Sequence, residues 1–191
     1  MRRVEQHVIK RSHAKFGEID ALAFASKNLW NLANYYARQS FIFQGKYLNN
    51  AALYPLLKHT DAYKALPAKV ANQVLIQLDK AWQSFFEAND EYKADPSQFT
   101  GRPKLPKYKH KTEGRNLLVY TIQALSKKGL KQGLIQPSML AIEVQTRHKY
   151  YFVSFSEDGT FGSVRSAGAR GRDPGTARAA PADAREAASY G

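Results

Sequence analysis

The sequence predicts an α+β protein with a helical middle part, strands before and after it, and an unstructured end. Three observations lead to this prediction. Apolar residues recur at three- and four-residue steps over much of residues 17–90, which is the spacing of one helix face. Residues 3–10 and 116–156 contain runs of β-branched and aromatic residues, which strands favour. From residue 158 the composition changes and no apolar period remains.

The first elements are a short strand and a long helix. Val4, Val8 and Ile9 make residues 3–10 a strand candidate. A helix is expected from Gly17, and Gly45 is a suitable stop because glycine adopts the left-handed conformation that closes helices. Its expected packed face consists of Leu22, Ala25, Leu29, Leu32 and Tyr36. A shorter helix is expected near Ala51–Lys58.

The strongest helix signal covers Pro67–Glu87. Proline at a first helical position loses no hydrogen bond, because its missing N–H has no partner there. Apolar residues follow at helical spacing, and the polar residues lie off that stripe. The stripe consists of Val70 or Ala71, Val74 or Leu75, Leu78, Trp82 and Phe85. This pattern predicts a helix packed on a helical neighbour.

Prolines and glycines interrupt regular structure from Ala94 onward, because each proline removes a donor and favours extended geometry in the residue before it. A strand is expected over Asn116–Leu125. A hairpin is expected between Met139–Gln145 and Lys149–Ser156, because the second run is aromatic and β-branched.

The end of the chain has a composition of its own. Of the 32 residues from Thr160 to Gly191, nine are Ala, five Gly and five Arg, and all 17 lysines lie before them. Such composition predicts disorder over residues 158–191. Because Ala, Gly and Arg have GC-rich codons, one hypothesis is translation in a shifted frame or fusion to foreign sequence. Reading the gene in all frames beyond Glu157 tests it.

Charge narrows the class of partner. The 29 Lys and Arg residues against 16 Asp and Glu give a formal net charge of +13, and such an excess attracts polyanions. Nucleic acid is the expected partner, and an anionic membrane surface is the weaker alternative. No apolar run is long enough to span a bilayer. The chain has no cysteine, which excludes thiol chemistry in it and fits a cytoplasmic protein. Oligomeric state is not predicted.

The densest basic cluster lies in residues 101–111 and extends to Arg115. Its prolines hold the segment extended, so alternate side chains face a phosphate backbone, and Phe99 and Tyr108 offer aromatic faces for a base. The simpler alternative is a solvated loop that links helices to strands. The expected nucleic-acid-binding residues are Arg102, Lys104, Lys107, Tyr108, Lys109, Lys111 and Arg115.

Catalytic patterns are not found. The five histidines are scattered without metal-ligand spacing, and the sequence contains neither a P-loop nor a GxSxG motif. Asp90, Glu91 and Asp95 cluster at a helix end, where carboxylates are usually solvated. We therefore expect no catalytic residue, no metal and no cofactor.

Two motifs in their order resemble the TnpB (OrfB) family of insertion-sequence proteins. Residues 66–86 resemble the family's "lp…Q…l…l…A…nFF" helix, and residues 101–111 resemble the "G.P.fP.fk.k" segment that follows it. Asn28–Asn34 is similar to an early "yN.a" helix, and Ile142–Phe155 resembles the strand pair before the nuclease domain. The resemblance covers roughly residues 3–157.

The resemblance implies a β-barrel wedge domain, here residues 1–16 with 112–157, and an inserted helical recognition domain, here 17–111. Family members act as transposases and RNA-guided DNA endonucleases, and their RuvC-like domain cuts with metal held by three carboxylates. This sequence enters its Ala/Gly/Arg tail where that domain's first motif is due. None of the three carboxylates has a counterpart, so no nuclease activity is expected from this chain alone.

The resemblance therefore implies the nucleic-acid-binding N-terminal portion of a transposase-like protein. Two alternatives stay open. One is a stand-alone regulatory RNA- or DNA-binding protein that restrains the full-length protein. The other is a non-functional relic of a decayed insertion sequence.

Overall fold

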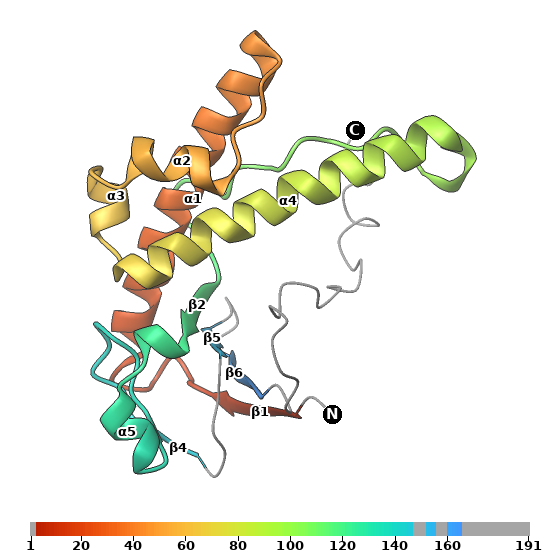
Figure 1. The fold of residues 1–191 in the computed structure, drawn as a ribbon. Helices are drawn as coiled ribbons and strands as arrows, with labels where there is room; N and C mark the ends of the chain where they lie inside the picture. Colours follow the sequence, from red (N-terminus) through yellow and green to blue (C-terminus); the bar gives the residue numbers. More distant parts are fainter. Residues whose placement is uncertain (1–2, 147–151, 156–159, 166–191) are drawn as a thin grey trace.

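The chain folds into a helical part and a smaller part built around a sheet (Figure 1). The computed structural model describes residues 3–146, 152–155 and 160–165. Helices α1–α4 lie together on one side, and the strands, with the short helix α5, lie below them in Figure 1. The mixed α and β content expected from the sequence is confirmed.

Helix α1 (Phe16–Gln44) is the long helix that the apolar spacing predicts. It ends at Gly45, whose φ of 64° is the left-handed conformation expected of a glycine stop. Its buried face differs from the expected one. Leu29 is fully buried, but Tyr36 is 38% exposed, and the polar residues Ser26, Lys27 and Asn34 are buried instead.

Two short helices and a second long helix complete this part. Helices α2 (Asn50–Leu57) and α3 (Asp61–Lys64) begin where the side chains of Asn49 and Thr60 accept backbone N–H groups, which caps them. Helix α4 (Ala68–Ala94) follows Pro67 and packs against α1, α2 and α3, as the stripe predicted. It extends beyond the expected end at Glu87. A 3₁₀ turn, η1 (Pro96–Gln98), comes next.

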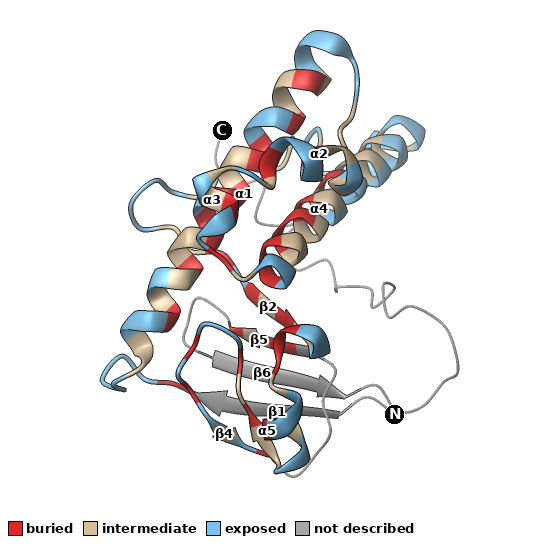
Figure 2. Ribbon diagram, turned by 60° about the vertical axis from the view of Figure 1, so that its left-hand side comes forward, coloured by how far each residue is buried: buried red, intermediate tan, exposed pale blue. Residues whose placement is uncertain are grey.

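The core of the helical part lies between α1 and α4. Figure 2 shows buried positions along α1 and along the N-terminal half of α4, whereas the C-terminal end of α4, called its far end below, is mostly exposed. Trp82 is fully buried at the centre, where Phe41, Tyr47 and Phe86 surround its ring. The prediction that Trp82 is a core residue is confirmed.

The four-stranded sheet has the order β1-β6-β5-β2, and all its neighbours are antiparallel. Its strands are β1 (Arg3–Val8), β2 (Leu118–Thr121), β5 (Phe152–Phe155) and β6 (Thr160–Arg165). The N-terminal strand therefore shares a sheet with strands that come after the helices, as expected. Within the described residues β1 and β2 are both edges, so this sheet is open and not a closed barrel.

A second, two-stranded sheet joins β3 (Leu134–Ile135) to β4 (Val144–Gln145). It follows the turn η2 (Ile122–Ala124) and helix α5 (Lys127–Lys131). The hairpin expected between Met139–Gln145 and Lys149–Ser156 is wrong in its pairing. Its first run pairs with β3, and its second, as β5, pairs with β2 and β6. Strand propensity marks a strand without specifying its partner.

The expected start of the unstructured end needs a similar correction. Thr160–Arg165 lies in the segment 158–191 that composition predicts to be disordered, yet it forms β6 with neighbours on both sides. Backbone pairing to β1 and β5 outweighs the weak strand preference of Gly162 and Ser163. Residues 166–191 lie outside the described residues.

Candidate nucleic-acid interface

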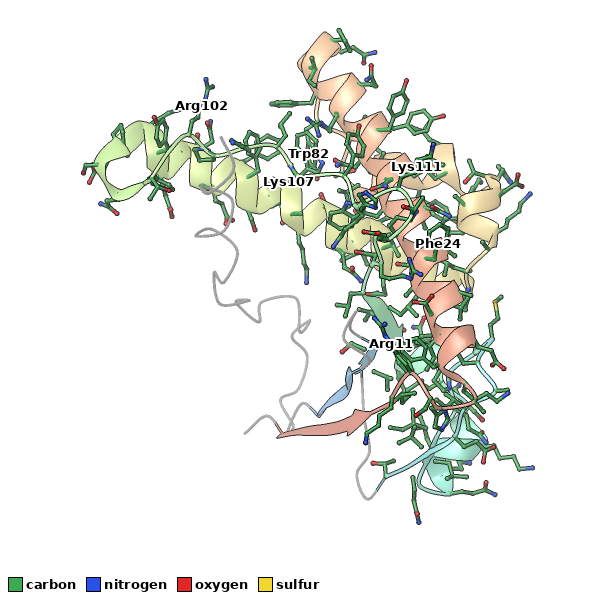
Figure 3. All side chains as sticks on the ribbon, turned by 180° about the vertical axis from the view of Figure 1, so that it is seen from behind. Arg11, Phe24, Trp82, Arg102, Lys107 and Lys111 are labelled. Carbon is green, nitrogen blue, oxygen red and sulfur yellow. The ribbon has the colours of Figure 1, made fainter. Side chains whose placement is uncertain are left out.

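The basic segment 101–111, called the strap below, runs as an extended chain between the two long helices. It leaves the far end of α4 after η1 and returns along α4 to α1, before the chain enters β2 (Figure 1). Figure 3 shows Arg102 near the far end of α4, Lys111 beside α1, and Lys107 between them. The strap has no helix or strand of its own, as its prolines predict.

Side chains of α1 bind the backbone of the strap. The indole Nε1 of Trp30 donates to the carbonyl of Lys107 at 3.2 Å, and the Nδ2 of Asn34 donates to the carbonyl of Pro106 at 2.9 Å. Asn31 makes two bonds with one residue, because its amide donates to the Lys109 carbonyl at 2.9 Å and accepts from the Lys109 N–H at 2.8 Å.

Two more donors on the same helix face extend this row. The ammonium of Lys27 donates to the carbonyl of Lys111, and Arg38 reaches the carbonyl of Pro106 at 3.5 Å. Positions 27, 31, 34 and 38 follow helical spacing, so they form one stripe. An extended segment pairs few of its own backbone groups, and this stripe supplies partners for them.

Four of the five Lys and Arg side chains of the strap are exposed. Arg102, Lys104, Lys107 and Lys111 are exposed, whereas Leu105 packs against the core. Lys109 is half-buried, with its ammonium 5.6 Å from the centroid of the Trp30 ring. The exposed cations form a positive track, and α1 binds the backbone of its second half, from Pro106 to Lys111.

Arg115, which the sequence also predicts to bind nucleic acid, is paired inside the protein. Its guanidinium donates to both carboxylate oxygens of Asp20 at 2.7 Å and lies 5.0 Å from the centroid of the Phe24 ring. These hydrogen bonds lower the pKa of Asp20, although partial burial of the carboxylate opposes the shift. Arg115 therefore anchors the chain just after the strap, and its contact with phosphate stays a prediction.

The two aromatic residues considered for base stacking differ in their surroundings. Phe99 is half-buried and meets Tyr92 edge-on, with ring centroids 5.7 Å apart. Tyr108 is 45% exposed, and the guanidinium of Arg38 lies 5.0 Å from its ring centroid. Of these two rings, Tyr108 offers the larger exposed surface.

Lys27 and Arg38 were not predicted as part of the site. Lys27 is only 2% exposed and lies with its ammonium 3.7 Å from the centroid of the Phe24 ring. Burial lowers its pKa, and the nearby charge of Arg115 lowers it further. The signal available in the sequence was a polar series at helical spacing, formed by Lys27, Asn31, Asn34 and Arg38. Such a series indicates a helix face that offers hydrogen-bond donors.

The described residues contain no group of three or more His, Asp or Glu side chains placed to hold a metal ion. Among the helices of that same part of the chain, none combines the length and apolar character needed to cross a membrane. No family model matches the chain. Comparison with curated proteins finds no match either.

Proposed function

We propose that this chain binds nucleic acid through the strap, in the manner of the N-terminal portion of a TnpB-like transposase protein. The observation that carries the proposal is the strap itself: its backbone from Pro106 to Lys111 is bound by α1, while Arg102, Lys104, Lys107 and Lys111 are exposed. A net charge of +13 adds long-range attraction for a polyanion over about 8 Å at physiological salt.

The arrangement of the chain supports the resemblance on which the family proposal rests. Strand β1 comes before the helices and β2, β5 and β6 come after them, yet all four share one sheet. The helices are thus inserted between strands of a single sheet, as a recognition domain inserted into a wedge domain would be. In this proposal α1–α4 and the strap are the recognition part, and the strands are part of the wedge.

The proposed binding is mainly electrostatic. Cations on an extended track contact phosphates and carry little sequence information. Catalysis is not part of the proposal, because the carboxylates of the family's nuclease domain have no counterpart in this sequence. In the proposed setting the chain holds nucleic acid, and cleavage during transposition requires a separate nuclease domain.

Binding of the full chain to labelled structured RNA and to duplex DNA across a salt series tests the proposal. If the four exposed strap cations contact phosphates of a duplex, log K falls against log salt with a slope of about −3.6. Six contacts, with Lys109 and Arg115 included, would steepen the slope to about −5.4. A folded protein that binds neither ligand at low salt would overturn the proposal.

A further inference from the structure

One edge of the strap carries aromatic rings beside its cations. Tyr108 projects from the strap and is 45% exposed, although Arg38 approaches its ring at 5.0 Å from the centroid. The same guanidinium is also held toward the strap by its contact with the Pro106 carbonyl. A planar cation next to a half-exposed tyrosine leaves a flat surface on which another planar group stacks.

Helix α1 adds a second exposed ring at the same place. Tyr35 is 49% exposed and lies four residues after Asn31 and three before Arg38, so it shares their helix face. Asn31 and Arg38 both contact the strap, at Lys109 and at Pro106. Tyr35 thus falls between two α1 residues that hold the strap, and its ring meets that of Tyr36 edge-on, with centroids 5.7 Å apart.

Cations and exposed rings together favour one form of nucleic acid. In a duplex the bases are stacked inside, so a surface track meets phosphates and sugars, and the tyrosine rings find no base face on which to stack. A single strand offers phosphates and the faces of its bases at once, and proteins bind it with basic grooves and aromatic platforms. The strap presents both kinds of group side by side.

From this juxtaposition we propose that Tyr108 and Tyr35 stack unpaired bases, so that the strap takes single-stranded nucleic acid in preference to duplex. The proposal rests on the proposed function, since the cations of the strap must first bind phosphate. Phosphates of the strand lie along Lys107 and Lys111, and bases turn toward the two tyrosines. Stacking is tolerant of sequence, because every base has an aromatic face.

The chain offers a matched control for the tyrosines. Tyr54 on α2 is 42% exposed and also has a cation near its ring, the ammonium of Lys58 at 5.8 Å. Its other aromatic contact is an edge-on one with Tyr63 of α3. Replacing Tyr54 therefore removes an exposed ring of the same kind without touching the strap.

The test compares three ligands of equal charge with the full chain: an unpaired oligonucleotide, an abasic oligonucleotide of the same length, and a duplex with the same number of phosphates. Dissociation constants are measured by fluorescence anisotropy at fixed salt. The wild type is expected to bind the unpaired oligonucleotide at least about fivefold more tightly than the abasic one. Y108A and Y35A are expected to reduce that ratio, whereas Y54A and Y108W keep it.

The outcomes separate the stacking proposal from the proposed function. Equal binding of all three ligands, unchanged in Y108A, would overturn stacking and leave phosphate binding by the strap intact. Absence of binding to every ligand by folded protein would overturn both. Circular dichroism of each variant checks that the helices are retained, which is expected because both tyrosines are exposed.

Discussion

Asn34 joins the strap to the core, and its replacement by alanine is the sharpest test of that connection. The residue is fully buried in α1 and uses both ends of its side-chain amide. Its Nδ2 donates to the Pro106 carbonyl at 2.9 Å, and its Oδ1 accepts from the indole Nε1 of Trp82 at 3.2 Å. N34A leaves a buried indole N–H without its partner and removes the shorter of the bonds to the Pro106 carbonyl.

The expected loss of stability follows from these two groups. A buried donor or acceptor left unsatisfied costs about 1–3 kcal/mol. Arg38 also reaches the Pro106 carbonyl, at 3.5 Å, so losing the bond from Asn34 to this carbonyl is expected to cost the lower value, about 1 kcal/mol. The two together predict a loss of about 3 kcal/mol in the free energy of unfolding. Alanine regains a few tenths of a kcal/mol from its better helix propensity.

Urea denaturation followed by far-ultraviolet circular dichroism measures the difference, because the helical signal does not depend on the environment of Trp82. The matched control is N28A, which replaces an exposed asparagine of the same helix and carries the same propensity gain. N28A is expected to stay within about 0.5 kcal/mol of the wild type. If N34A were no less stable than N28A, the bonds of Asn34 would not hold the strap to the core.

Two further predictions concern the segment that follows the strap and its pairing with α1. In G114A the new Cβ would lie 2.6 Å from the backbone oxygen of His110, so the turn must shift. The free energy of unfolding, measured by urea denaturation, is expected to fall by about 1–3 kcal/mol. The control G101A, where nothing lies within 4 Å of the new Cβ, is expected to be neutral. The lowered pKa of Asp20 contributes stability that is present above its unfolded value of 3.8 and lost as pH falls through the lower folded value. In D20N, unfolding measured from pH 5 to pH 2 is therefore expected to depend less on pH than in the wild type.

Periodicity and helix punctuation predicted the helical part well. The apolar stripe of residues 70–85 predicts a packed helix face, and α4 packs against α1, α2 and α3. Gly45 ends α1 for a local reason, its positive φ. The packed face of α1 was harder to predict from the sequence, because α1 contacts α4 on one side and the strap on another. An apolar stripe cannot reveal a face that is buried through hydrogen bonds to an extended chain.

Pairing between distant segments was not predictable from one sequence. Strand β6 combines Thr160 and Val164 with Gly162 and Ser163, a mixture without a clear strand pattern, and its two neighbours complete its backbone bonds. The same limit applies to Arg115. Its charge indicates a ligand contact, but its partner Asp20 is 95 residues earlier in the chain.

The central claim is that the strap, and not the net charge of the chain, binds nucleic acid. Two variants of the full chain test it most directly, each with four cations changed to glutamine and the same loss from a net charge of +13. One changes Arg102, Lys104, Lys107 and Lys111, and the other changes four exposed lysines elsewhere, Lys64, Lys69, Lys128 and Lys131. The strap variant is expected to lose at least about tenfold in affinity together with most of the salt dependence, and the control to change by less than about threefold. Equal losses in the two variants would contradict the claim, because binding would then follow total charge.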